Sequence, residues 1–190
     1  FNILWELYKL RDTKNSEIEF VVYLKDKPRS DLPKKDTNWK YQILPGGGFW
    51  ILTKLKPHLL LTRQKPDILF SPSHYTVPIL QVPRVCSIMD LGYLEFSGQF
   101  QKKVFWQLKY WTAISILASK KVIAISKATA KDIVRQYPSA SNKVVVTYLG
   151  YDRNKYNDEV NINDVRQIKH KYSIEDRKST RLNSSHESPS

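Results

Sequence analysis

Polar side chains follow two apolar segments of this sequence, at the positions where buried strands would end. His74 lies in SPSH, directly after DILFS, and Asp90 and Tyr93 lie in MDLGY, which continues the segment RVCSI. A histidine at such a place can donate to a hydroxyl or a phosphate, and an aspartate can orient a hydroxyl or act as a base. These residues, with Met89 beside them, are therefore candidates for substrate contact, and Asp90 is the candidate for catalysis.

A third candidate position follows the segment VIAI, where Ser126 and Lys127 begin a helical pattern. Ser126 is expected to be the N-cap of that helix, and ligand contact from the same helix start is compatible with capping. Structural alternatives stay open for the other two positions. Asp90 could cap the turn that follows it, and a lone histidine such as His74 is usually structural or simply exposed.

The elements that must position these residues alternate between strands and helices. Apolar runs predict strands at 67–71, 84–89, 122–126 and 144–150, with helices at 98–119 and 127–137. Strands that are apolar throughout are typical of a parallel sheet with helices on both faces. The alternation therefore predicts an α/β fold with an open parallel sheet, whose binding crevice lies at the carboxyl ends of the strands.

The region before Lys65 has weaker patterns. They predict a helix over residues 1–12, strands over 19–24 and 40–44, and a helical segment over 49–63 that is interrupted near Pro57. The glycines of 46–48 are interpreted as an ordinary turn, because neither a GxGxxG pattern nor a Walker lysine-serine pair accompanies them. No metal-binding cluster and no nucleophile elbow is visible either.

Composition restricts the classes of possible partner but does not select one of them. The formal net charge of +13 indicates an anionic partner, which could be nucleic acid, an acidic membrane or a phosphorylated substrate. The single cysteine, Cys86, excludes a disulfide within the chain and is interpreted as a small buried hydrophobe. The helix predicted over 98–119 mixes aromatic residues with lysines, so it could be a core helix with a solvated face or could lie on an anionic membrane.

Four segments between Lys65 and Tyr156 resemble the amino-terminal domain of family 4 glycosyltransferases, which have the GT-B fold. They are KPDILFSPSHYTVP, VCSIMDLGYLEF, ASKKVIAISKATAKDIVRQYP and NKVVVTYLGYD. The resemblance implies two Rossmann-like domains across a cleft, with the acceptor in the amino-terminal half and a nucleotide sugar in the other. It implies sugar transfer to a lipid or saccharide acceptor with retention of anomeric configuration, usually without a required metal and with no cofactor.

The resemblance also assigns roles to single residues. It implies a catalytic role for Asp90, acceptor contacts for His74, Met89, Tyr93, Ser126 and Lys127, and a hinge between the domains at Gly150, Tyr151 and Asp152. The family commonly places a histidine before this aspartate, whereas Met89 stands there, and His74 is a candidate to compensate in part. A cytoplasmic location, at the inner face of the membrane, and no nucleic-acid partner are expected.

Both ends of the chain depart from the family pattern. Residues 1–160 are expected to form the acceptor-side domain without its first strand, and 161–175 to begin the linker or second domain. Residues 176–190 resemble a translated sequencing adapter and are expected to be disordered. Such a fragment is expected to be inactive by itself. The alternatives are a non-catalytic basic module that binds nucleic acid or anionic membrane, and another GT-B-like enzyme.

Overall fold

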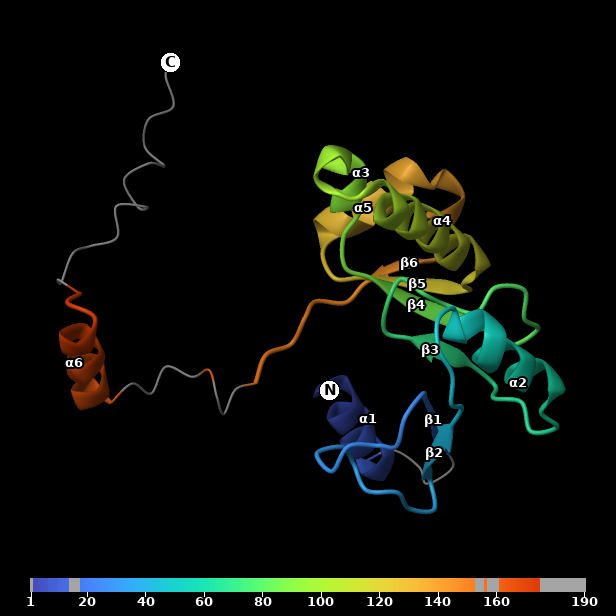
Figure 1. The fold of residues 1–190 in the computed structure, drawn as a ribbon, viewed down its shortest axis with the longest axis horizontal. Helices are drawn as coiled ribbons and strands as arrows, with labels where there is room; N and C mark the ends of the chain where they lie inside the picture. The colour runs from blue at the N-terminus through green and yellow to red at the C-terminus, as the bar shows by residue number, and fades with distance from the viewer. Residues whose placement is uncertain (1, 14–17, 153–155, 157–160, 175–190) are drawn as a thin grey trace. The chain divides into compact units, whose positions relative to one another are not determined.

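The computed structural model describes residues 2–13, 18–152, 156 and 161–174 (Figure 1). The chain divides into two compact units, Phe1–Tyr148 and Leu149–Ser190. The first unit holds both sheets and most of the helices, and the second holds one helix among its described residues. Residues 176–190, for which the sequence predicts a foreign origin, lie outside the described residues.

All strands of the first unit pair in parallel, which confirms the α/β class. The strands are β1 Phe20–Leu24, β2 Trp39–Ile43, β3 Leu69–Ser71, β4 Arg84–Ile88, β5 Lys121–Ala124 and β6 Val144–Val146. β1 pairs with β2 in one sheet, and β3 to β6 form a second sheet in sequential order. The apolar runs predicted these strands but not their division into two sheets, because such a run does not specify its pairing partner.

Two strands, β3 and β6, are shorter than their predicted apolar runs by two residues or more. β3 begins at Leu69 rather than Asp67, and β6 ends at Val146 rather than Gly150. β6 lies at the edge of its sheet and pairs with β5 alone. Because the register aligns Ala124, the last residue of β5, with Val146, the chain beyond Thr147 has no strand opposite it.

The predicted helices are present, with changed ends. They are α1 Asn2–Thr13, α2 Lys56–Leu61, α4 Lys102–Ala118 and α5 Lys127–Gln136. The sequence did not predict the short α3 Gly92–Glu95 or α6 Ile162–Lys171. α4 starts four residues later than predicted, because Ser97–Gln99 form a separate 3-10 turn and Gln101 has an extended backbone. Pro138 follows α5 and opens a 3-10 turn over Pro138–Ala140, as expected of a residue that cannot continue the helix.

The interruption predicted near Pro57 takes the form of a change in helix type. A π-helical turn over Ile51–Leu55 leads directly into α2. The N–H of Lys56 donates to the carbonyl of Ile51, five residues back, and Pro57 then occupies the first turn of α2. A proline is tolerated there because its missing N–H would have no partner within the α-helix.

The main core lies between the four-stranded sheet and two of the helices. Cys86 and Ile88 of β4 and Val122 of β5 are buried against Ile116 of α4 and Ile133 of α5. Figure 1 shows α4 and α5 on the same side of this sheet. That placement follows from right-handed crossovers between strands in sequential order. The prediction that Cys86 is a buried apolar residue is confirmed, since its side chain is inaccessible to solvent.

Two basic side chains hold the carboxyl end of α4. Arg84 donates to the carbonyl of Ala118 at 2.8 and 3.0 Å, and Lys143 donates to the carbonyls of Leu117 and Ser119, each at 3.0 Å. These carbonyls have no partner within the helix, and positive charge is favourable at this end of the helix dipole. α4 is therefore fixed to the starts of β4 and β6.

Candidate functional site

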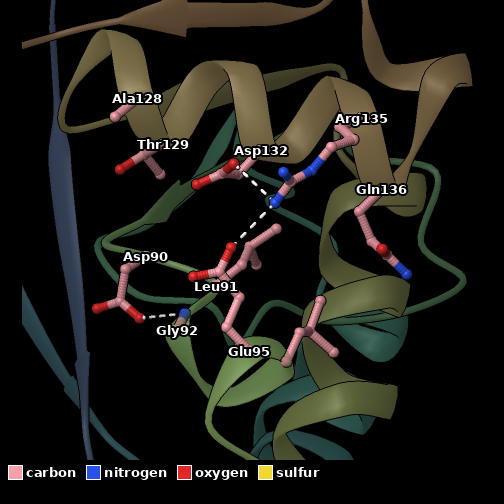
Figure 2. Close-up of a pocket in the computed structure, with 10 residues that line it drawn as sticks. Asp90, Leu91, Gly92, Glu95, Ala128, Thr129, Asp132, Arg135 and Gln136 are labelled. Atoms are coloured by element: carbon pink, nitrogen blue, oxygen red, sulfur yellow. Dashed lines mark hydrogen bonds and ion pairs between the residues drawn. The ribbon is translucent and has the colours of Figure 1, made fainter.

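A cavity of about 530 Å³ opens at the carboxyl ends of β4 and β5. One wall is the segment that follows β4, and the other is α5 (Figure 2). The lining residues are Asp90, Leu91, Gly92, Leu94, Glu95, Ala128, Thr129, Asp132, Arg135 and Gln136. The volume lies within the range of roughly 300–1,000 Å³ that is usual for small-molecule sites. The cavity thus lies where a parallel sheet is expected to bind its ligand.

Asp90 has a structural role and also faces this cavity. Its Oδ1 accepts a hydrogen bond from the backbone N–H of Gly92 at 2.8 Å, which confirms the turn-capping interpretation. A side chain at Gly92 would place its Cβ 3.2 Å from the same oxygen, so the glycine permits this close approach. The carboxylate is therefore held in a fixed orientation at the cavity wall.

The start of α5 is tied to the end of β4 by a short chain of hydrogen bonds. Ser126 Oγ accepts from the N–H of Thr129 at 3.0 Å, so the predicted N-cap is confirmed. Thr129 Oγ1 in turn donates to the carbonyl of Met89 at 3.0 Å. Two of the sequence-predicted positions, Met89 and Ser126, are thereby joined through a residue that the sequence did not single out.

An arginine crosses the cavity between two carboxylates. Figure 2 shows Arg135 of α5 with one nitrogen bonded both to Glu95 of α3, at 3.1 Å, and to Asp132 on its own helix, at 3.0 Å. With Asp90, the charged lining comprises three carboxylates and one guanidinium. The cavity is therefore acidic, although the chain as a whole carries +13.

Glu95, Asp132 and Arg135 are not among the residues that the sequence singles out. Asp132 and Arg135 have the i, i+3 spacing of a helical ion pair, which is a weak signal because such pairs are common on solvated faces. Glu95 lies 40 residues before Arg135, so nothing in the sequence indicates that they meet. Only the packing of α3 beside α5 brings them together.

His74 follows β3, which pairs with β4, the strand that precedes Asp90. Its Nε2 is buried and has no hydrogen-bond partner among the described residues, and its ring lies 4.1 Å from that of Tyr75. Burial lowers the pKa of His74 below its usual 6.5, and the charge of Asp90 partly opposes that shift. His74 and Asp90 are therefore within electrostatic range of each other, and His74 is neutral at pH 7.

The remaining predicted residues lie elsewhere. Tyr93 is only 5 % exposed and belongs to the core, where burial raises the pKa of its hydroxyl. Lys127 is exposed on the first turn of α5 and does not line the cavity. Gly150, Tyr151 and Asp152 are exposed residues of the second unit. The acceptor contacts of Tyr93 and Lys127, and the hinge, stay predictions.

Within the described part of the chain, no group of three or more histidine, cysteine, aspartate or glutamate side chains is arranged to hold a metal ion. The three carboxylates of the cavity instead share hydrogen bonds with a backbone amide and with a guanidinium. These arrangements leave carboxylate oxygens at the wall that can accept hydrogen bonds from a ligand.

Comparison with known proteins gives one match. Residues 17–155 match the sequence model of Glycosyltransferase Family 4, and this range includes every residue that lines the cavity. No match was found among curated proteins or among solved structures.

Proposed function

Since the chain belongs to glycosyltransferase family 4, we propose that it forms the acceptor side of an enzyme that transfers a sugar from a nucleotide sugar, with retention of configuration. The single observation that supports this role best is the acidic cavity at the carboxyl ends of β4 and β5. No metal and no resident cofactor are assigned to it. The nucleotide sugar is a substrate, and an expected hinge at 150–152 would allow a donor half to close on this one.

The lining of the cavity favours a neutral saccharide over a free phosphate. Carboxylates accept hydrogen bonds from hydroxyl groups and repel anions, and the one guanidinium is already shared by Glu95 and Asp132. Leu91, Leu94 and Ala128 add apolar surface on which the carbon–hydrogen face of a sugar ring can pack. A hydroxyl-rich acceptor, free or carried on a lipid, therefore fits this lining best.

Asp90 and His74 are the groups assigned to the reacting hydroxyl. The Asp90 carboxylate, oriented by the Gly92 amide, would accept the proton of the acceptor hydroxyl as its oxygen forms the new glycosidic bond. The bond between the sugar and the nucleotide phosphate breaks in the same transfer, and the nucleotide leaves. His74 is neutral and its Nε2 lacks a partner among the described residues, so it can donate to or accept from a sugar hydroxyl. Met89 occupies the position of the family histidine, and His74 would supply part of that function.

Acceptor binding tests this assignment directly. Neutral oligosaccharides titrated into the 190-residue chain should shift the backbone amide resonances of Gly92 and Thr129, and Asp90→Asn should weaken binding about tenfold or more. Asn keeps a side-chain oxygen that can accept from Gly92, so the turn should survive while the charge-assisted bond to the ligand is lost.

Asp67→Asn is the matched control, because Asp67 is an exposed aspartate just before the opposite end of β3. Its binding should equal that of the unchanged chain. If Asp67→Asn and Asp90→Asn weakened binding equally, or if inorganic phosphate bound to the cavity more tightly than the saccharides, the proposed acceptor site would be wrong.

A further inference from the structure

The two faces of α4 differ less in polarity than those of a normal surface helix. The inner face packs on the core through Phe105 and Leu108 and buries Thr112, Ser115 and Ile116. The outer face of α4 is apolar too, and its exposed side chains recur every three or four residues: Trp106, Tyr110, Ile114 and Leu117. Tyr110 is 60 % exposed and Leu117 is 56 % exposed. A solvated surface helix normally presents polar residues on this side.

The aromatic side chains of the outer face are organised rather than scattered. Trp106 and Tyr110 stack with their ring centroids 5.5 Å apart and their planes at 21°. The ammonium of Lys109 lies 4.9 Å from the centroid of the Trp106 ring. Tryptophan and tyrosine are suited to the boundary between water and lipid, because each has an apolar body and a polar tip.

The charge of this region has a single sign. From Gly98 to Lys121 the sequence contains no aspartate or glutamate and five lysines, at 102, 103, 109, 120 and 121. Lys102 and Lys103 are exposed at the amino end of α4, and the segment just before them exposes the rings of Phe96 and Phe100. Positive charges are unfavourable at the amino end of a helix dipole, so helix stability does not account for them.

We propose that the outer face of α4 docks on a bilayer surface that contains anionic phospholipids. α4, which is ~25 Å long, would lie in the plane of the interface with Trp106, Tyr110, Ile114 and Leu117 toward the acyl chains. The lysines of both helix ends would then reach the phosphate groups. No described helix is long and apolar enough to cross a membrane.

The observations favour a membrane over a protein partner. A protein interface depletes lysine, whereas this face is bordered by lysines without a single acidic residue between Gly98 and Lys121. The excess of positive charge over the whole chain, +13, attracts it to the same surface. The proposal does not rest on glycosyl transfer. Membrane docking can therefore be disproved while the saccharide site is confirmed, and the saccharide site can be disproved while membrane docking is confirmed.

Vesicle co-sedimentation of the 190-residue chain tests the docking surface. The chain should bind vesicles of phosphatidylcholine and phosphatidylglycerol in equal parts, and bind phosphatidylcholine vesicles only weakly.

Lys102→Gln with Lys103→Gln should weaken binding to the anionic vesicles roughly thirtyfold, since each lysine near the surface contributes to the attraction. The matched control is Lys34→Gln with Lys35→Gln, an exposed adjacent pair outside α4 that removes the same charge. Equal losses in both pairs would overturn the proposal, because they would indicate attraction by net charge alone.

The aromatic residues are tested at constant charge. Trp106→Ser with Tyr110→Ser should lower binding at least tenfold, whereas the control Tyr148→Ser with Tyr172→Ser, two tyrosines that are equally exposed at 63 %, should not. Near-ultraviolet circular dichroism and thermal melts would verify that each variant is folded. Unchanged vesicle binding of the Trp106 and Tyr110 variant would overturn the proposal.

Fluorescence locates the contact without a disruptive variant. Lipids brominated in the acyl chains should quench part of the tryptophan emission of the bound chain. Trp106→Phe, measured at a lipid concentration that binds all of the variant, should lose that quenching. Quenching that persists in Trp106→Phe would place another tryptophan in the bilayer and contradict the proposed face.

A shift from dimer to monomer on Trp106→Ser with Tyr110→Ser, measured by light scattering without lipid, would instead identify the outer face as a contact between two copies and reject the membrane.

Discussion

At the scale of single residues, the structural contacts are compatible with the proposed functional roles. Asp90 caps a turn through Oδ1 and also lines the cavity. It can still accept hydrogen bonds from a ligand, because a carboxylate has more acceptor positions than the turn uses. Ser126 caps α5, and the same contact places Thr129 where its hydroxyl reaches Met89. His74 differs, since its buried Nε2 has no partner within the described residues and so incurs a desolvation cost without a compensating bond.

That unpaired histidine predicts a pH-dependent stability. Its pKa in the folded chain lies below the usual 6.5, so above pH 6.5 both folded and unfolded chains carry it neutral. As the pH falls below 6.5, the unfolded chain takes up the proton first, and the free energy of unfolding decreases until the folded pKa is reached. His74→Gln should remove this loss, as measured by urea unfolding at a series of pH values, and His170→Gln on exposed α6 should not. An equal acid sensitivity of the His74 variant would contradict this assignment.

At the scale of elements, α5 forms half of the cavity lining. It supplies five of the ten lining residues, and its first turn is attached to β4 through Thr129. The orientation of α5 therefore determines whether Asp132 and Arg135 face Glu95. α4 is fixed in a different way. Arg84 and Lys143 hold its carboxyl end, and its outer face stays exposed to solvent.

Removing the cap of α5 should loosen this arrangement. Ser126→Ala should lower the free energy of unfolding by about 1 kcal/mol, because the N–H of Thr129 loses its acceptor. Denaturant titration measures this loss, with Ser30→Ala in the loop between β1 and β2 as a control that should be neutral. Saccharide affinity should fall as well, as α5 moves relative to β4. A variant with lower stability but unchanged affinity would mean that the cap does not position the cavity.

At the scale of the whole molecule, the proposed function makes the described residues one wall of a transfer site. The acidic cavity and the exposed face of α4 belong to the same unit, Phe1–Tyr148, so a chain docked on a membrane could take a saccharide acceptor carried on a lipid. The family fold, as the sequence resemblance implies, holds the nucleotide sugar in a separate carboxyl-terminal half. Transfer requires donor and acceptor to be held together, since positioning supplies much of the rate.

The 190-residue chain should therefore bind acceptor but show no turnover with any nucleotide sugar. A panel of radiolabelled nucleotide sugars, incubated with the chain and the saccharides that it binds, measures this expectation. Binding of the acceptor in the same samples is the control that the chain is folded. Robust transfer by the chain alone would mean that the donor site lies within these residues.

The sequence by itself determined the class of the fold and the family. Continuous apolar runs such as VCSI and VIAI specify buried parallel strands, and their spacing leaves room for one helix between neighbours. Local chemistry also predicted the cap at Ser126 and the turn at Asp90, because each bond joins residues two or three apart in the chain. The family match over residues 17–155 confirms the resemblance that these segments carry.

Only the tertiary structure decided which residues distant in sequence are in contact. The strands divide into two sheets, and Glu95 meets Arg135 from 40 residues away. The sequence of α4 has aromatic residues on most of its circumference, and only packing shows that Phe105 faces the core while Trp106 and Tyr110 face outward. The physical reason is common to all three. A residue type fixes how its neighbours in sequence hydrogen-bond, whereas the partner of an apolar surface or of a charge is set by which elements the whole chain packs together.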